Sequence, residues 1–280
     1  MKKICVVGAG VMGLDVAQVF AAKDFKVLVR DINDAILQKA QDRMKSSLEK
    51  LVSKGKKTQE EADKVIGNIS FTTELKDAAD ADLVLEAIIE NLEVKQGLFK
   101  ELDGICKPDA IFASNTSSVS LTAMAMVTSR PDKFIGMHFF NPAGVMKLVE
   151  VIRGALTSDE TFKTVYELAS FIGKDPIEVK ESPAFVVNRI LIPMMNEAVC
   201  VLADGVASAE DIDKAMKLGA SHVIGPLALC DLVGNDVTLN IMETLYHETG
   251  DPKYRPSVLL RQMVRAGKLG RKTGEGFFKY

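Results

Sequence analysis

The sequence has few of the residues that build metal sites or disulfide scaffolds. Its 280 residues include four cysteines and three histidines. The cysteines stand far apart and form no CxxC pair, and the histidines form no HExxH motif or His/Cys cluster. We therefore expect no bound metal, and reduced thiols of the kind usual in a cytoplasmic protein. These thiols are Cys5, Cys106, Cys200 and Cys230.

Long apolar runs and a strong excess of charge are also lacking. No run approaches the ~20 apolar residues that a membrane-spanning helix needs. The apolar stretch that follows Lys3 breaks at Gly8, which is too early for a signal peptide. The formal net charge is −3, so the chain offers no overall basic surface for nucleic acid. These absences predict a cytoplasmic protein that binds neither membranes nor nucleic acid.

What is present is an ordinary globular composition, with 47% hydrophobic and 26% charged residues. The length exceeds the usual size of one domain. The first part of the chain alternates short apolar runs with amphipathic stretches, which is typical of βαβ units and of a parallel sheet covered by helices. We expect strands at 4–7, 26–30, 82–86, 110–113, 134–138, 147–152 and 176–179. We expect helices from the first glycine turn to Lys23 and at 34–54, 59–66, 121–126 and 161–172.

The segment Glu181-Ser182-Pro183 marks a boundary, because no strong strand pattern follows it. Beyond it we expect only helices. The sequence therefore predicts an α/β domain of the Rossmann type at residues 1–181 and a smaller all-α domain at residues 182–280. The expected helices of the second domain are 184–203, 209–218, 227–248 and 257–266.

The segment Gly8–Gly13, GAGVMG, fits the GxGxxG pattern of dinucleotide-binding proteins. It follows the first expected strand and opens a helix, which is the context that makes this pattern specific. Gly8 permits a tight turn, Gly10 lets a pyrophosphate approach the backbone, and Gly13 lets the helix pack on the strand. The phosphates would bind to the N–H groups at the helix N-terminus. The predicted contact residues are Gly8, Gly10, Val11, Met12 and Gly13.

An acidic residue ends the second expected strand. Asp31 lies 23 positions after Gly8, close to the ~20-residue spacing at which an acid binds the adenosine ribose. A carboxylate there repels the 2′-phosphate of NADP, whereas the neighbouring Arg30 could hold that phosphate. The pattern favours NAD over NADP.

A histidine ends an apolar strand in Gly136–Pro142, GMHFFNP. A hairpin centred near Gly144 would place His138 opposite Glu150, and cross-strand partners can touch. A carboxylate on one imidazole nitrogen fixes the tautomer and stabilises the cation, so the other nitrogen can exchange a proton. This pair is suited to take the hydroxyl proton when an alcohol is oxidised by hydride transfer. A lone histidine in such a strand would more often be structural.

Two further polar features remain ambiguous from the residues alone. The segment Ser114–Ser118, SNTSS, follows a strand and could be a helix-capping loop or a set of donors at the same sheet edge. Asn188 stands in an apolar helical segment, where a buried amide needs a partner. It could make a structural hydrogen bond or reach towards a substrate.

The chain resembles the 3-hydroxyacyl-CoA dehydrogenase family over nearly its whole length. The resemblance rests on the segments already described and on three more: Glu86–Asn91, Lys147–Ile152 and Leu269–Gly274. It implies an enzyme that uses NAD to interconvert a short-chain (S)-3-hydroxyacyl-CoA and the matching 3-ketoacyl-CoA. An example is the interconversion of (S)-3-hydroxybutyryl-CoA and acetoacetyl-CoA. It also implies a homodimer joined through the helical domain.

The resemblance assigns roles to individual residues. His138 would be the general acid/base and Glu150 its orienting partner, while Ser117 and Asn188 would bind the substrate oxygens. Four residues would help to hold the cofactor: Glu90, Lys95, Asn115 and Lys272.

A basic stripe runs along the expected helix 34–54. Lys39, Arg43, Lys50 and Lys54 fall within about 60° of one another at ~100° per residue. The stripe is either a solvated helix face or a binding surface for the phosphates of coenzyme A. The resemblance singles out Lys50 and Lys54 for the second role.

The chain departs from the family pattern at several positions. Leu14-Asp15 replaces two small residues, and Asp15 adds a negative charge that suits the helix dipole but disfavours a nearby pyrophosphate. Gly144 and Val258 stand where proline is expected, Ala184 replaces a glycine, and Val223-Ile224 replaces a Pro-Met pair. None of these positions belongs to the predicted catalytic set.

Two other functions stay open. A non-enzymatic structural homologue would keep the dinucleotide fold, but it would be favoured only if the catalytic residues were missing. A dehydrogenase of free β-hydroxy acids would typically use a helical lysine as acid/base, whereas this chain offers His138 and Glu150.

Overall fold

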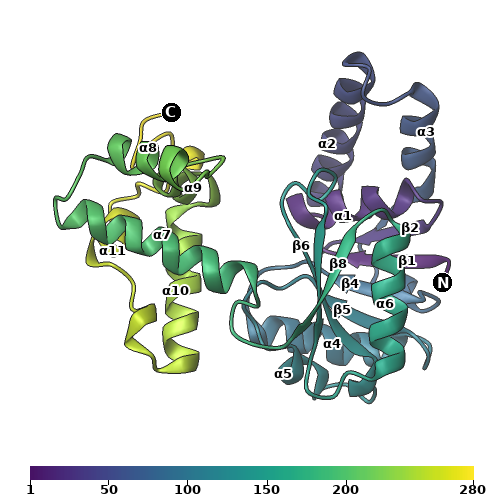
Figure 1. Cartoon of the computed structure of the whole chain (residues 1–280). Coiled ribbons are helices and arrows are strands. Elements are labelled where there is room, and N and C mark those ends of the chain that lie inside the picture. The colour runs from purple at the N-terminus through teal and green to yellow at the C-terminus, as the bar shows by residue number, and fades with distance from the viewer. The chain divides into compact units, whose positions relative to one another are not determined.

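The structure is a computed structural model that describes residues 1–280. The chain forms two compact units, Met1–Glu181 and Ser182–Tyr280 (Figure 1). Each unit contains a hydrophobic core of its own. None of the helices is both long enough and apolar enough to cross a membrane.

An eight-stranded sheet forms the centre of the first unit, in the order β3-β2-β1-β4-β5-β6-β7-β8. Strands β1 to β6 pair in parallel, β6 and β7 form an antiparallel pair, and β7 pairs in parallel with β8. The predicted Rossmann-type α/β fold followed by a helical domain is confirmed. The strands are β1 Lys3–Val7, β2 Lys26–Arg30, β3 Ile69–Thr72, β4 Leu83–Glu86, β5 Ile111–Ser114, β6 Phe134–Phe139, β7 Leu148–Arg153 and β8 Asp175–Lys180.

The central strands form where the sequence has continuous apolar runs, as expected for strands that are covered on both faces. Every residue of β4, β5 and β6 is buried. Strand β3 was not expected from the sequence. It lies at one edge of the sheet, none of its four residues is buried, and the run ISFT is too short to stand out, although Ile, Phe and Thr favour strands.

Helices cover the sheet of the first unit, and α2 and α3 together form a two-helix arm (Figure 1). The Asn33 side chain accepts a hydrogen bond from the Ile36 N–H at the start of α2, and Thr58 and Glu61 form a capping box at the start of α3. The helices are α1 Val11–Ala21, α2 Asp34–Ser53, α3 Gln59–Asn68, α4 Leu92–Ile105, α5 Leu121–Ala125 and α6 Asp159–Phe171, with 3₁₀ turns η1 Leu75–Ala78 and η2 Pro131–Lys133.

The second unit is helical, as predicted, but the expected single helix at 227–248 is wrong. Gly234 has φ of +107°, a backbone conformation that is accessible to glycine and incompatible with a continuous helix. It separates α9 from α10. The elements are α7 Val187–Ala203, α8 Ala209–Gly219, α9 Pro226–Val233, α10 Asn235–Thr249, η3 Pro252–Tyr254, α11 Val258–Arg265 and η4 Arg271–Thr273.

Helix α7 begins three residues later than expected. Ala184 and Phe185 have φ of +59° and +56°, in the left-handed region, so the helix starts only at Val187. This conformation explains why glycine is expected at position 184. An alanine there costs roughly 1–2 kcal/mol.

A buried carboxylate anchors the segment that follows α11. Asp231, on α9, is 1% exposed and accepts hydrogen bonds from the N–H groups of Phe277 and Phe278, both at 2.9 Å. The Tyr280 hydroxyl donates to the same carboxylate at 3.2 Å. A Cβ atom at Gly276 would lie 1.9 Å from Asp231 Oδ1, so only glycine fits there. Asp231 therefore fixes the path of the segment that carries η4.

We predict that Asp231→Ala destabilises the second unit by about 3 kcal/mol, because the buried Asn235 amide and several partly buried donors lose their acceptor. The Phe277 and Phe278 amides should exchange with deuterium faster than in the unchanged protein. Urea unfolding and hydrogen exchange measure the two effects. Asp204→Ala is the matched control, since Asp204 is exposed, and it should change stability by less than about 0.5 kcal/mol. Equal stabilities for the Asp231 and Asp204 variants would contradict the anchoring role.

Candidate active site

The glycine segment Gly8–Gly13 connects β1 to α1. Gly8 has φ of +112°, and a Cβ atom there would lie 2.4 Å from the Ala87 carbonyl oxygen. A Cβ atom at Gly13 would lie 1.9 Å from the Gly8 oxygen, so this helix packs directly on the turn. Gly10 caps α1 without a side-chain hydrogen bond, and a Cβ atom there would meet nothing within 4 Å. Open space in front of a helix N-terminus fits the phosphates of a dinucleotide.

Asp31 follows β2 and lies against this turn. Its Oδ2 accepts a hydrogen bond from the Ala9 N–H at 2.7 Å, and its Oδ1 accepts one from the Ile32 N–H at 2.7 Å. Arg30 donates from Nε to the Thr73 carbonyl oxygen at 3.2 Å. The carboxylate thus adjoins the predicted phosphate site, while the Arg30 guanidinium is anchored at the carboxyl end of β3.

His138 and Glu150 are direct partners across the antiparallel pair of β6 and β7. His138 Nδ1 lies 2.7 Å from Glu150 Oε2. Glu150 is fully buried and His138 is 6% exposed. The predicted hairpin register is therefore confirmed. A buried carboxylate at this distance fixes the orientation of the imidazole.

Asn115 joins the end of β5 to its neighbours. Its N–H donates to the Glu86 carbonyl oxygen at 2.8 Å, and its Oδ1 accepts from the Phe139 N–H at 2.9 Å. Phe139 directly follows His138 in the chain. Asn115 therefore holds the loop after β5 beside the strand that carries the histidine.

Lys95, on α4, is buried between two glutamates. Its Nζ lies 2.6 Å from Glu86 Oε1 and 3.1 Å from Glu90 Oε2, and it is 1% exposed. Glu86 also accepts hydrogen bonds from the Ser114 hydroxyl at 2.6 Å and from the Ile88 N–H at 2.7 Å. Glu86 was not among the predicted site residues, although an acid at the end of the apolar strand LVLE is a signal for it.

Glu90 extends this network to the loop after β5. It accepts hydrogen bonds from the Thr116 hydroxyl at 2.5 Å, the Ser117 N–H at 2.9 Å and the Ser118 N–H at 3.1 Å. Burial raises the pKa of Glu90, but the Lys95 charge and these hydrogen bonds outweigh it, so the pKa lies below its usual value. An ionised Glu90 thus holds Ser117 in place.

The remaining predicted site residues belong to the second unit. Asn188 lies in the first turn of α7 and is half-buried rather than buried. Lys272, in η4, forms an ion pair with Asp236, with Nζ 2.5 Å and 2.6 Å from the two carboxylate oxygens. The predicted roles of Asn188 and Lys272 towards a ligand stay predictions.

The predicted basic stripe on α2 separates into two kinds of residue. All four residues are exposed, but Arg43 alone also donates to the Gly10 carbonyl oxygen, at 2.7 Å. Leu37, Met44 and Leu48 are buried on another face of the helix.

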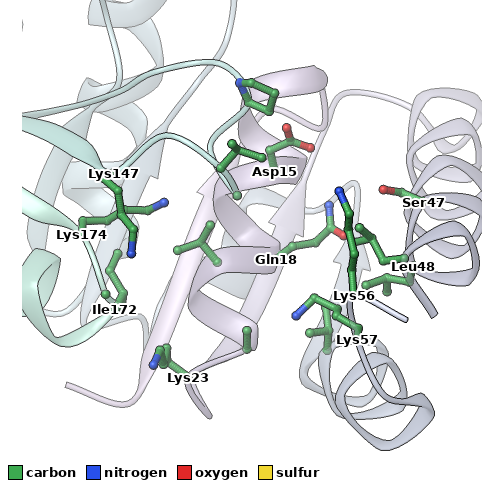
Figure 2. Close-up of a pocket in the computed structure, with 18 residues that line it drawn as sticks. Asp15, Gln18, Lys23, Ser47, Leu48, Lys56, Lys57, Lys147, Ile172 and Lys174 are labelled. Atoms are coloured by element: carbon green, nitrogen blue, oxygen red, sulfur yellow. The ribbon is translucent and has the colours of Figure 1, made fainter. Parts of the chain in front are cut away.

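A cavity of about 540 Å³ lies beside this helix and is lined by side chains of α1, α2 and the loops after α2 and β6 (Figure 2). Ser47 contributes to it from α2, and Asp15 is the acid that lines it. Lys174 is buried and donates to the carbonyl oxygens of Ala143 and Met146. Burial, and then the charge of Lys147, lower the pKa of Lys174. The cavity is thus positively charged through Lys23, Lys56, Lys57, Lys147 and Lys174.

Comparisons with known proteins cover the whole chain. The model described as 3-hydroxyacyl-CoA dehydrogenase, NAD binding domain, matches residues 3–182, and the model of the C-terminal domain of the same family matches residues 185–280. A 3-hydroxybutyryl-CoA dehydrogenase of Clostridioides difficile is 52% identical over 99% of both chains. A probable 3-hydroxybutyryl-CoA dehydrogenase of Deinococcus radiodurans is 53% identical over 99% of this chain and 100% of its own.

A solved structure agrees with these relatives. The (S)-3-hydroxybutyryl-CoA dehydrogenase PaaH1 from Ralstonia eutropha superposes with a TM-score of 0.96 at 51% identity, and the match covers 100% of this chain and 99% of that one. The resemblance predicted from the motifs is therefore confirmed. The first unit carries the NAD-binding domain, and the chain belongs to the 3-hydroxyacyl-CoA dehydrogenase family.

Proposed function

We propose that the protein is an NAD-dependent dehydrogenase that interconverts (S)-3-hydroxybutyryl-CoA, or a similar short-chain 3-hydroxyacyl-CoA, and acetoacetyl-CoA. The observation that carries the proposal is the buried pair of His138 Nδ1 and Glu150 Oε2, 2.7 Å apart. The pair lies towards the carboxyl end of β6, the parallel-strand edge where ligands bind in open α/β sheets. The glycine turn after β1 lies at the carboxyl end of another parallel strand.

In the oxidative direction His138 takes the proton of the 3-hydroxyl group. Bound NAD would supply the hydride acceptor for C3, so that the alcohol loses one hydride and one proton and becomes a ketone. Glu150 stabilises the imidazolium that forms and keeps Nε2 as the atom that exchanges the proton. In the reductive direction the same imidazolium returns the proton to the carbonyl oxygen.

The other predicted residues hold the reactants. Ser117 and Asn188 donate hydrogen bonds to the substrate oxygens. Glu90, which is paired with Lys95, accepts a hydrogen bond from the Ser117 N–H and so holds Ser117 in place. Four residues help to hold the cofactor: Glu90, Lys95, Asn115 and Lys272. Asp31 binds the adenosine ribose, an assignment supported by its position against the glycine turn.

The phosphate-bearing part of coenzyme A binds along α2. The exposed positions of Lys50 and Lys54 support this assignment, as does the lysine-lined cavity next to that helix. Remote contacts of this kind position the reacting carbon without taking part in the chemistry.

The two other candidate functions lack a supporting observation. A non-enzymatic homologue would not need the buried pair of His138 and Glu150. A free β-hydroxy acid would not need the basic surfaces beside α2. Turnover of acetoacetyl-CoA and of free acetoacetate with NADH separates all three functions. The proposed enzyme reduces the thioester and not free acetoacetate, a dehydrogenase of free β-hydroxy acids reduces acetoacetate, and a non-enzymatic homologue reduces neither.

The homodimer and the cytoplasmic location stay predictions. The second unit exposes several large apolar side chains, which a partner subunit would cover. They include Ile190, Val206, Leu218, Val223 and Val258, which are 69% to 101% exposed.

We predict that His138→Asn lowers kcat by about 10² to 10⁴, the usual contribution of general acid–base catalysis. Glu150→Gln should lower kcat by less, because it weakens stabilisation of the imidazolium and leaves the base in place. Steady-state kinetics with acetoacetyl-CoA and NADH measure both effects. The dissociation constant of NADH should not change. Normal turnover in His138→Asn would remove this residue from the mechanism.

We predict a preference for NADH over NADPH that depends on Asp31. Asp31→Ala removes both the ribose contact and the repulsion of the 2′-phosphate, so the ratio of the two kcat/KM values should fall about tenfold. The comparison needs both cofactors at one fixed acetoacetyl-CoA concentration. A wild-type preference for NADPH would contradict the assignment and would point to Arg30 instead.

We predict that the double change Lys50→Ala with Lys54→Ala raises the KM for acetoacetyl-CoA about threefold to tenfold, the sum of two exposed charge contacts. It should also flatten the dependence of KM on ionic strength, because exposed charges are screened by salt. A truncated thioester without the nucleotide serves as the control substrate and should respond little. Unchanged KM and salt dependence would mean that Lys50 and Lys54 are only solvated.

A further inference from the structure

Arg43 links the arm of α2 to the phosphate-binding turn. Its Nη2 donates to the Gly10 carbonyl oxygen at 2.7 Å and to the Ala9 carbonyl oxygen at 3.3 Å. The Gly10 oxygen also accepts the first helical hydrogen bond of α1, from the Leu14 N–H at 3.1 Å. The guanidinium therefore binds the glycine segment and the start of α1 through the same Gly10 carbonyl oxygen.

The turn is held from two sides. The Ala9 N–H donates to Asp31 at 2.7 Å, while the carbonyl oxygens of Ala9 and Gly10 accept from Arg43. Because carbonyl oxygens carry no net charge, Arg43 keeps its positive charge next to the turn. A dinucleotide phosphate that approaches Gly10 would meet this charge.

Asp15 places the opposite charge on the same helix. It is the fifth residue of α1, is half-buried, and lines the cavity beside α2 (Figure 2). This position lies beyond the first turn of α1, which holds no acid, so the expectation that Asp15 acts on the helix N-terminus is wrong. Burial raises the pKa of Asp15, and the charge of Arg43 offsets only part of this effect.

We propose that Arg43 is a positioning residue for the dinucleotide, because it holds the Ala9–Gly10 backbone in place. The inference depends on dinucleotide binding and not on the identity of the acyl substrate.

The test is the dissociation constant of NADH, measured by fluorescence at low ionic strength without a second substrate. Arg43→Ala should raise it about tenfold or more, an effect typical of losing one charge-assisted hydrogen bond. Arg43→Lys, which keeps the charge, should lie between the wild type and Arg43→Ala.

Lys39→Ala is the matched control, because Lys39 is an exposed cation one helical turn before Arg43. It should change the constant by less than about twofold. Adenosine, which has no phosphates, should bind the wild type and Arg43→Ala alike. Equal NADH affinity in the wild type and Arg43→Ala overturns the proposal. A loss of adenosine affinity that matches the loss of NADH affinity also overturns it. Thermal unfolding of each variant checks that it is folded, and failed turnover with acetoacetyl-CoA would leave these binding results unaffected.

Discussion

The geometry of the site in the first unit depends on the burial of one ammonium group. Lys95 Nζ lies between Glu86 and Glu90 with almost no exposure to solvent. A buried charge is costly unless it is paired and hydrogen-bonded, and removal of one partner from such a pair costs about 3–5 kcal/mol. The three side chains must therefore be placed together, which ties the end of β4 to α4 and to the loop after β5.

The reversed strand β7 imposes a second constraint. In a parallel sheet, neighbouring strands are joined by crossover connections, so residues that lie side by side are far apart in the sequence. A hairpin instead places His138 and Glu150, which are 12 positions apart, side by side. The hairpin alone therefore brings the fully buried Glu150 against His138, and no contact between distant parts of the chain is needed. The parallel strand β1 ends at the glycine turn, and the antiparallel pair places His138 next to Glu150.

Much of this arrangement could be predicted from the sequence, because it follows from local patterns. The apolar runs located seven of the eight strands, and the spacing around Gly144 predicted the register of His138 and Glu150. The failures have physical causes. Helix α4 was not expected, since its buried face includes Lys95 in place of an apolar residue. The break between α9 and α10 depends on the φ angle of Gly234, which sequence periodicity does not report. The contact of Arg43 with Gly10 joins two elements through tertiary packing, so the stripe on α2 alone could not reveal it.

The Asp231 anchor has a consequence for the order in which the chain is synthesised. The carboxylate leaves the ribosome before its partners, since Phe277 follows it by 46 positions. At 5–20 residues per second the delay is about 2–9 s. During that interval α9 carries an acid whose final hydrogen bonds do not yet exist, and water must solvate it. The hydrogen bonds from Phe277 and Phe278 to Asp231 therefore form only after α9 and α10 have been made, while the first unit, complete at Glu181, has time to form its sheet.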